Sequence, residues 1–175
     1  MIDEFWRAYN QSLFAYYYHK LERDSLKFRM KLIGIASYVV TAISLAGWGI
    51  TVSYAVVWSV VIFACQLLHG LKDFLEYPKR VWSTETYMQY AAAIDLDMAK
   101  TWRDICMGHL TEDEIRENIN TYEARLKEIS IQYINPYSLK DNQGLITKAN
   151  EMTDMELASR HGSGVVFYEE TSTPR

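Results

Sequence analysis

The chain lacks charge over one long stretch, because the forty residues between Lys31 and Lys72 include no Asp, Glu, Lys or Arg. As a helix with a rise of 1.5 Å per residue, this stretch would be about 60 Å long, twice a hydrocarbon core of about 30 Å. Gly47 and Gly49 lie near its middle, where the chain can reverse direction. Helices of soluble proteins usually carry charges on their outer face, so a hairpin buried in a soluble protein is the less favoured interpretation. The expected fold class is therefore an all-α membrane protein with a two-span transmembrane hairpin.

The groupings of residues that catalysis requires are also missing. The four histidines are scattered, with no second ligand at a spacing typical of a metal site. No glycine-rich phosphate loop, nucleophile elbow or cysteine pair is present. Asp95 and Asp97 are two residues apart, so on a helix they point in nearly opposite directions. We therefore interpret them as ordinary solvated carboxylates and not as a catalytic pair. We expect no enzyme, no catalytic residue, no metal and no cofactor.

Basic residues are absent from the turn of the expected hairpin but flank it on both sides: Lys20, Arg23, Lys27, Arg29 and Lys31 precede it, and Lys72, Lys79 and Arg80 follow it. The positive-inside rule then predicts that both termini are cytoplasmic. The two cysteines, Cys65 and Cys106, would lie in different compartments, so no disulfide is expected. No stripe of Lys and Arg of the kind that binds duplex nucleic acid is visible.

These features divide the chain into four segments. Residues 1–31 contain neither Gly nor Pro and predict an amphipathic lead-in helix. Residues 32–71 form the hairpin, residues 72–161 a cytoplasmic helical domain, and residues 162–175 a flexible C-terminal tail. Within the helical domain, a helix is predicted to begin at Ser83, and another at a capping box that runs from Thr111 to Glu114.

Apolar residues recur at alternating steps of four and three after the capping box: Ile115, Ile119, Tyr122, Leu126, Ile129 and Tyr133. Such a heptad-like seam requires an apolar partner. The partner is either the preceding helix or the same helix of another subunit. In the second case the six residues are an oligomer seam.

Small and polar side chains recur on one face of each expected span. They either let helices pack closely or line a water-filled axis in a ring of subunits. The candidate pore-lining residues are Ser37, Thr41, Ser44, Ser59, Gln66 and His69. Gln66 is the strongest, because an amide within a span is costly unless it faces a partner or water. Asp73 and Glu76 would form acidic rings at the cytoplasmic mouth, or else are ordinary solvated charges at a helix end.

Two stretches carry a family resemblance. Residues 102–115 contain Gly108-His109-Leu110-Thr111 followed by Glu112-Asp113-Glu114-Ile115, and Ala149-Asn150-Glu151 lies in a late helix. With the lead-in helix and the hairpin, they resemble the SLATT family of bacterial two-transmembrane effectors.

The resemblance implies an oligomeric ion channel or pore-forming effector of an anti-phage (abortive infection) system, in the bacterial inner membrane. It implies gating through the helical domain, by a nucleotide or oligonucleotide that a partner nucleotidyltransferase makes. The expected partners are thus the lipid bilayer, copies of the chain in a homo-oligomer (a tetramer or larger), and this signal. The alternative is a non-conducting membrane anchor or scaffold that recruits a soluble partner.

Overall fold

The protein is described by a computed structural model over residues 1–47, 55–74, 76–137 and 142–161. These residues form helices and their connections, and no strand occurs among them. The α-helices are α1 (Ile2–Gly47), α2 (Ala55–Phe74), α3 (Tyr77–Cys106), α4 (Glu112–Tyr133) and α5 (Gln143–His161), with a short 3₁₀ helix at Asn135–Tyr137.

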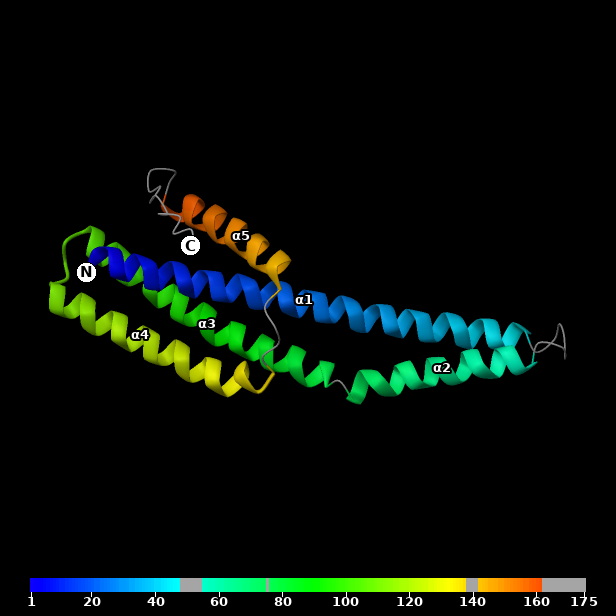
Figure 1. Ribbon diagram of the computed structural model, residues 1–175. Coiled ribbons are helices and arrows are strands. Elements are labelled where there is room, and N and C mark those ends of the chain that lie inside the picture. Colours follow the sequence, from blue (N-terminus) through cyan, green and yellow to red (C-terminus); the bar gives the residue numbers. More distant parts are fainter. Residues whose placement is uncertain (48–54, 75, 138–141, 162–175) are drawn as a thin grey trace, which may run out of the picture.

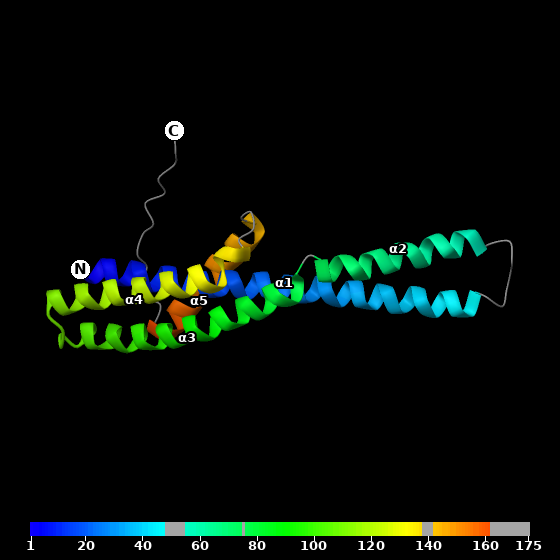
Figure 2. The ribbon, with the colours of Figure 1, turned by 90° about the horizontal axis from the view of Figure 1, so that it is seen from below.

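The long helix α1 organises the molecule. Its 46 residues extend about 70 Å at 1.5 Å per residue. The first part of α1 packs with α3, α4 and α5 in what we call the body (Figure 1). The rest of α1, residues 32–47, pairs with α2 to form a projecting arm, and both views show the two helices side by side (Figures 1 and 2).

The prediction of an all-α membrane protein with a two-span hairpin is wrong, although the helical part of it holds. Within the described parts of the chain, none of the helices combines the length and the apolar character needed to cross a bilayer. The physical reason lies in how the uncharged stretch is divided. Of its described residues, sixteen (32–47) lie in α1 and seventeen (55–71) in α2, against the roughly 20 that a span needs. On the body side, α1 continues without a break into a charged helix.

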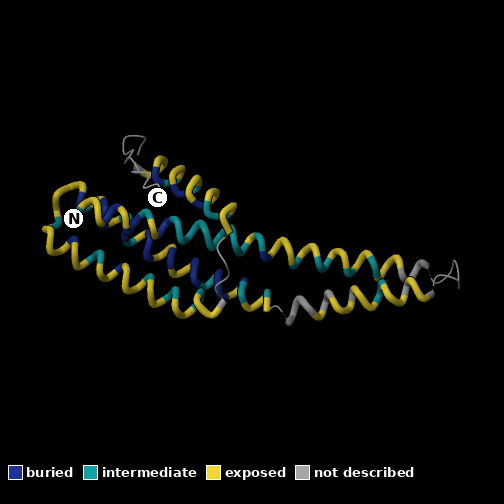
Figure 3. Tube along the Cα trace, viewed as in Figure 1, coloured by how far each residue is buried: buried dark blue, intermediate teal, exposed yellow. Residues whose placement is uncertain are grey.

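The body has an aromatic and aliphatic core between α1, α3 and α4. Phe5 and Tyr9 of α1 are fully buried and recur one helical turn apart. The Phe5 ring stacks on Trp102 of α3, with 6.2 Å between centroids, and meets the edge of Tyr122 of α4 at 6.3 Å. Figure 3 shows that the buried positions concentrate in the body, whereas the arm is largely exposed.

The predicted capping box at the start of α4 is confirmed. The Thr111 hydroxyl accepts a hydrogen bond from the Glu114 backbone N–H (3.4 Å), and the Glu114 carboxylate accepts one from the Thr111 N–H (2.7 Å). These two bonds satisfy backbone donors that the first turn of a helix leaves without partners. The turn before the box passes through Gly108 at φ +71°, a conformation that glycine adopts without strain.

Replacing Thr111 with alanine is expected to lower the free energy of unfolding by about 1 kcal/mol, the usual cost of losing an N-cap side chain. Urea denaturation followed by circular dichroism measures the change. Thr147→Ala is the matched control, because the Thr147 hydroxyl bonds only to the carbonyl of Gln143 within its own helix. Equal losses in the two variants would contradict the role of the cap.

The capping box also predicts an acid dependence. The hydrogen bond from the Thr111 backbone N–H, followed by the bond from its hydroxyl, lowers the pKa of Glu114. A carboxylate with a lowered pKa contributes stability that is complete above its ordinary pKa and is lost as the pH falls through the lowered value. The difference in stability between wild type and Thr111→Ala should therefore shrink at acidic pH.

Candidate functional site: the arm and its root

Both helices of the arm expose large apolar side chains. Each of these residues is between 47% and 80% exposed: Leu32, Ile35, Tyr38, Val39 and Ile43 on α1, and Val56, Val57, Val60, Phe63 and Leu67 on α2. By contrast, four residues on one side of α1 are less exposed: Ile33, Gly34, Ser37 and Val40. They lie in the part of α1 that packs with α2. The pairing of the two helices therefore leaves one side of each helix exposed.

The predicted polar stripe on α1 lies partly along this inner side. Ser37 is half-buried, whereas Thr41 is exposed and its hydroxyl donates to the Ser37 carbonyl at 2.8 Å. Ser44 lies within α1, but its side chain is outside the described residues. Among the described atoms, none lies within 4 Å of a Cβ atom added to Gly34.

Of the polar residues predicted on α2, the two whose side chains the structure describes are exposed. Ser59 and Gln66 are both exposed, and the side chains of His69 and Asp73 are outside the described residues. Glu76 is exposed at the start of α3, and its carboxylate pairs with Lys79 at 2.8 Å. Among the described side chains, the structure thus does not bring Ser59, Gln66 and Glu76 together within a single chain.

The apolar seam of α4 packs inside the chain. Ile115 and Tyr122 are buried in the core, and the Tyr122 hydroxyl hydrogen-bonds with Thr101 of α3 at 2.8 Å. The other members of the seam are half-buried and pack against the same core or next to it: Ile119, Leu126, Ile129 and Tyr133. Of the two partners that the sequence left open, the described chain uses the preceding helix.

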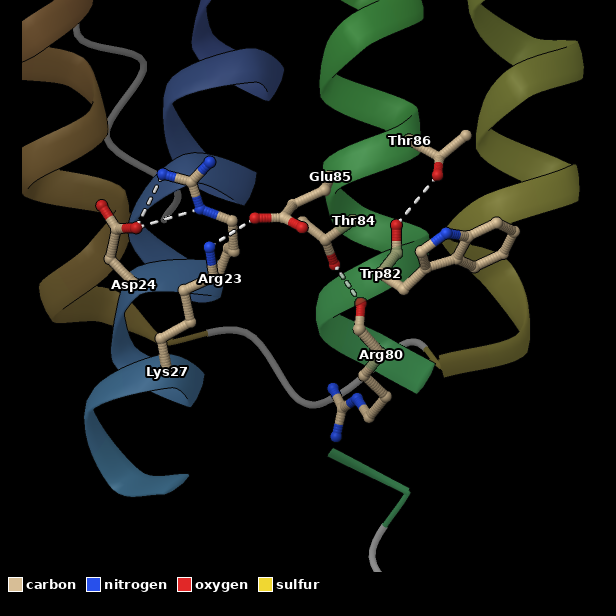
Figure 4. Close-up of polar contacts among 8 residues, drawn as sticks. All are labelled: Arg23, Asp24, Lys27, Arg80, Trp82, Thr84, Glu85 and Thr86. Carbon is tan, nitrogen blue, oxygen red and sulfur yellow. Dashed lines mark hydrogen bonds and ion pairs between the residues drawn. The ribbon is translucent and has the colours of Figure 1, made fainter. Parts of the chain in front are cut away.

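Ion pairs tie α1 to α3 at the root of the arm. Lys27 of α1 pairs with Glu85 of α3, as Figure 4 shows. One turn away, Arg80 lies 3.4 Å from Glu22, which also contacts His19 at 3.1 Å. The pair between Arg80 and Glu22 is partly shielded from water, whereas the pair between Lys27 and Glu85 is exposed. Both pairs join α1 to α3 where the arm leaves the body.

A second polar cluster, which we call the clamp, holds α5 on the body. One nitrogen of the Arg160 guanidinium donates to Asp95 of α3 and to the Tyr9 hydroxyl of α1, both at 2.9 Å, and a second donates to Glu156 at 2.7 Å. Burial alone would lower the pKa of Arg160, but the bonds to Asp95 and Glu156 raise it above its ordinary value. Burial, and then the charge of Asp95, raise the pKa of Tyr9.

The sequence did not reveal the clamp. Asp95 was expected to be a solvated carboxylate, but it is only 8% exposed, and this expectation is wrong. Its partner Arg160 lies 65 residues away and belongs to no motif. Asp97 does face solvent, where it pairs with Arg125 at 3.4 Å.

Comparison of the chain with protein-family models, with curated proteins and with solved structures finds no match. Within the described residues, no three His, Cys, Asp or Glu side chains are grouped so that they could hold a metal ion. The functional argument therefore depends on three structural features, which are the packed helical body, the fifth helix held by the clamp, and the exposed apolar arm.

Proposed function

We propose that the protein is a non-enzymatic, oligomeric effector that acts on a lipid bilayer through its arm. The observation that carries this proposal is the exposure of large apolar side chains around a stretch of forty uncharged residues. Burial of apolar surface contributes about 25 cal/mol per Å², and soluble monomers rarely expose a continuous apolar patch beyond a few hundred Å². The arm therefore requires an apolar cover. Helices can enter the interfacial layer of a bilayer through such side chains without crossing it.

Association between copies follows from the polar groups of the arm. Ser37, Thr41 and Gln66 lie among apolar side chains, and in lipid an amide is costly unless it faces another polar group. Arms that pack against one another would let these groups meet. Clustering of several arms in the interfacial layer, which disturbs the packing of the lipids, is the form of activity that this arrangement favours.

The body is suited to control the arm. Because α1 runs unbroken from the core of the body to Gly47, a change in the packing of its first half is carried into the arm. The resemblance to the SLATT effectors supports this division of roles between a controlling body and an arm that acts on the membrane. It implies that the arm permeabilises the bacterial inner membrane in anti-phage defence. It further implies that a nucleotide or oligonucleotide signal acts on the body.

Vesicle flotation tests the proposal. The full chain is expected to float with vesicles, and Val60→Asp with Phe63→Asp is expected to weaken binding more than 100-fold, since each apolar side chain contributes about 1.5–3 kcal/mol when buried. Both side chains are about 60% exposed, so the variant should keep its fold. The matched control is Ile131→Asp with Met155→Asp, two exposed apolar residues of the body. Wild-type protein that stays with the unbound fraction, or an arm variant that floats like wild type, would contradict the proposal.

A further inference from the structure

The root of the arm is surrounded by an excess of basic residues. We call residues 20–31 of α1 and 76–86 at the start of α3 the collar. It contains seven Lys or Arg and four Asp or Glu residues, a net charge of +3. The arm beyond it is uncharged as far as residue 71. The positive charge is therefore concentrated where the apolar surface begins.

The four acidic residues of the collar are all matched by bases within it. Besides the pairs that join α1 to α3, Asp24 pairs with Arg23 at 2.7 Å and Glu76 with Lys79 at 2.8 Å (Figure 4 shows the first). Of the remaining cations, Lys20 lies over the ring of Tyr17, 5.5 Å from its centroid. The net charge of +3 is therefore carried by Lys20, Arg29 and Lys31, because a ring contact does not neutralise the charge of Lys20.

Arg29 and Lys31 carry two of these three charges. Both are exposed, and neither forms an ion pair with another residue of the described chain. Lys31 immediately precedes Leu32, the first exposed apolar residue of the arm. The two cations are thus available to an anionic partner at the boundary between the charged body and the apolar arm.

Two large aromatic side chains are exposed in the same collar. Phe28 is 63% exposed beside Arg29 on α1, and Trp82 is 65% exposed on α3, where Figure 4 shows it pointing away from the ion pairs of α1. Aromatic rings, and long basic side chains whose stems lie on apolar surface, are the groups that favour the interface between lipid and water. Basic residues near such an interface are attracted to anionic headgroups.

We propose that the collar binds the headgroup layer of an anionic membrane, with Arg29 and Lys31 contacting lipid phosphates and Phe28 and Trp82 lying at headgroup depth. This inference rests on the proposed function, because it requires that the arm enters lipid. It adds the class of lipid that the protein prefers and the depth to which the arm enters the bilayer. The rest of the body, which has an excess of acidic residues, stays outside the layer.

Binding to two kinds of vesicle tests the inference. One is phosphatidylcholine alone, and in the other phosphatidylserine replaces part of the phosphatidylcholine. Since each basic residue near an anionic surface contributes about a fivefold increase in binding, wild type should prefer the anionic vesicles by about 30-fold at low salt. The preference should fall as salt is added. Arg29→Glu with Lys31→Glu should abolish it while binding to phosphatidylcholine remains.

The matched control is Arg7→Glu with Lys127→Glu, which changes the net charge equally at two exposed positions of the body. It should retain the preference, and circular dichroism checks that both variants are folded. Equal binding of wild type to the two kinds of vesicle, or an equal loss in the control, would overturn the inference and leave the proposed function standing. Wild type that binds neither kind would overturn both.

Discussion

Replacing Phe5 with alanine is expected to lower the free energy of unfolding by about 3–5 kcal/mol, the cost of removing a buried aromatic side chain from a packed core. Phe5 is fully buried, and its ring contacts both Trp102 and Tyr122. Alanine would leave a cavity at the point where α1, α3 and α4 meet, and would remove both aromatic contacts. The loss is a large fraction of the 5–15 kcal/mol that stabilises a typical domain. Urea denaturation monitored by tryptophan fluorescence measures it.

Phe28→Ala is the control for this prediction. Phe28 lies on the same helix but is 63% exposed, so its replacement should change the free energy of unfolding by less than about 0.5 kcal/mol. If the two alanine variants were equally stable, the core assigned to the body would be incorrect.

Replacing Arg160 with methionine is expected to release α5 from the body. The substitution removes the donor that Asp95 and Tyr9 share and leaves a carboxylate in a site only 8% exposed. Breaking a buried ion pair costs about 3–5 kcal/mol, but about a third of the Arg160 side chain is exposed, and solvent screening reduces the cost to about 1–3 kcal/mol. Hydrogen exchange should therefore show that the amides of residues 143–161 lose protection by roughly 5- to 150-fold.

Two further variants separate the clamp from other effects. Arg160→Lys keeps the charge but cannot donate to several acceptors in the fixed geometry of a guanidinium, so intermediate protection is expected. Lys148→Met removes a charge from an exposed position of α5 and should leave exchange unchanged. Unaltered protection of α5 in Arg160→Met would show that its apolar face alone holds the helix.

Local patterns allowed the sequence to predict much of the body. The capping box at Thr111 was found because its two hydrogen bonds join residues three apart, and the apolar period of α4 correctly marked the side that packs. The start of α3 was missed. The helix begins at Tyr77, not Ser83, because a proline is tolerated in the first turn, where its missing N–H has no helical partner.

The predictions that were wrong depend on contacts between distant residues and on the true length of the helices. Nothing near Asp95 in the sequence indicates a buried carboxylate, since Arg160 reaches it only after α5 folds back onto α1 and α3. The two-span hairpin was inferred by treating forty uncharged residues as helix throughout. In the structure, α1 and α2 contain sixteen and seventeen of these residues, and α1 is an extension of a body helix. Within the described residues, each apolar helix segment is therefore shorter than a span requires.

The most direct test of the central claim, that the arm acts on a bilayer, is release of an entrapped dye from anionic vesicles upon addition of the full chain. Wild type is predicted to release the dye, and Val60→Asp with Phe63→Asp is predicted to release none. Gln66→Leu should still bind but release less, because it removes an exposed amide from the arm. Wild type that binds the vesicles and leaves the dye inside would contradict the effector function and favour an anchor or scaffold, and wild type that neither binds nor releases would contradict the role assigned to the arm.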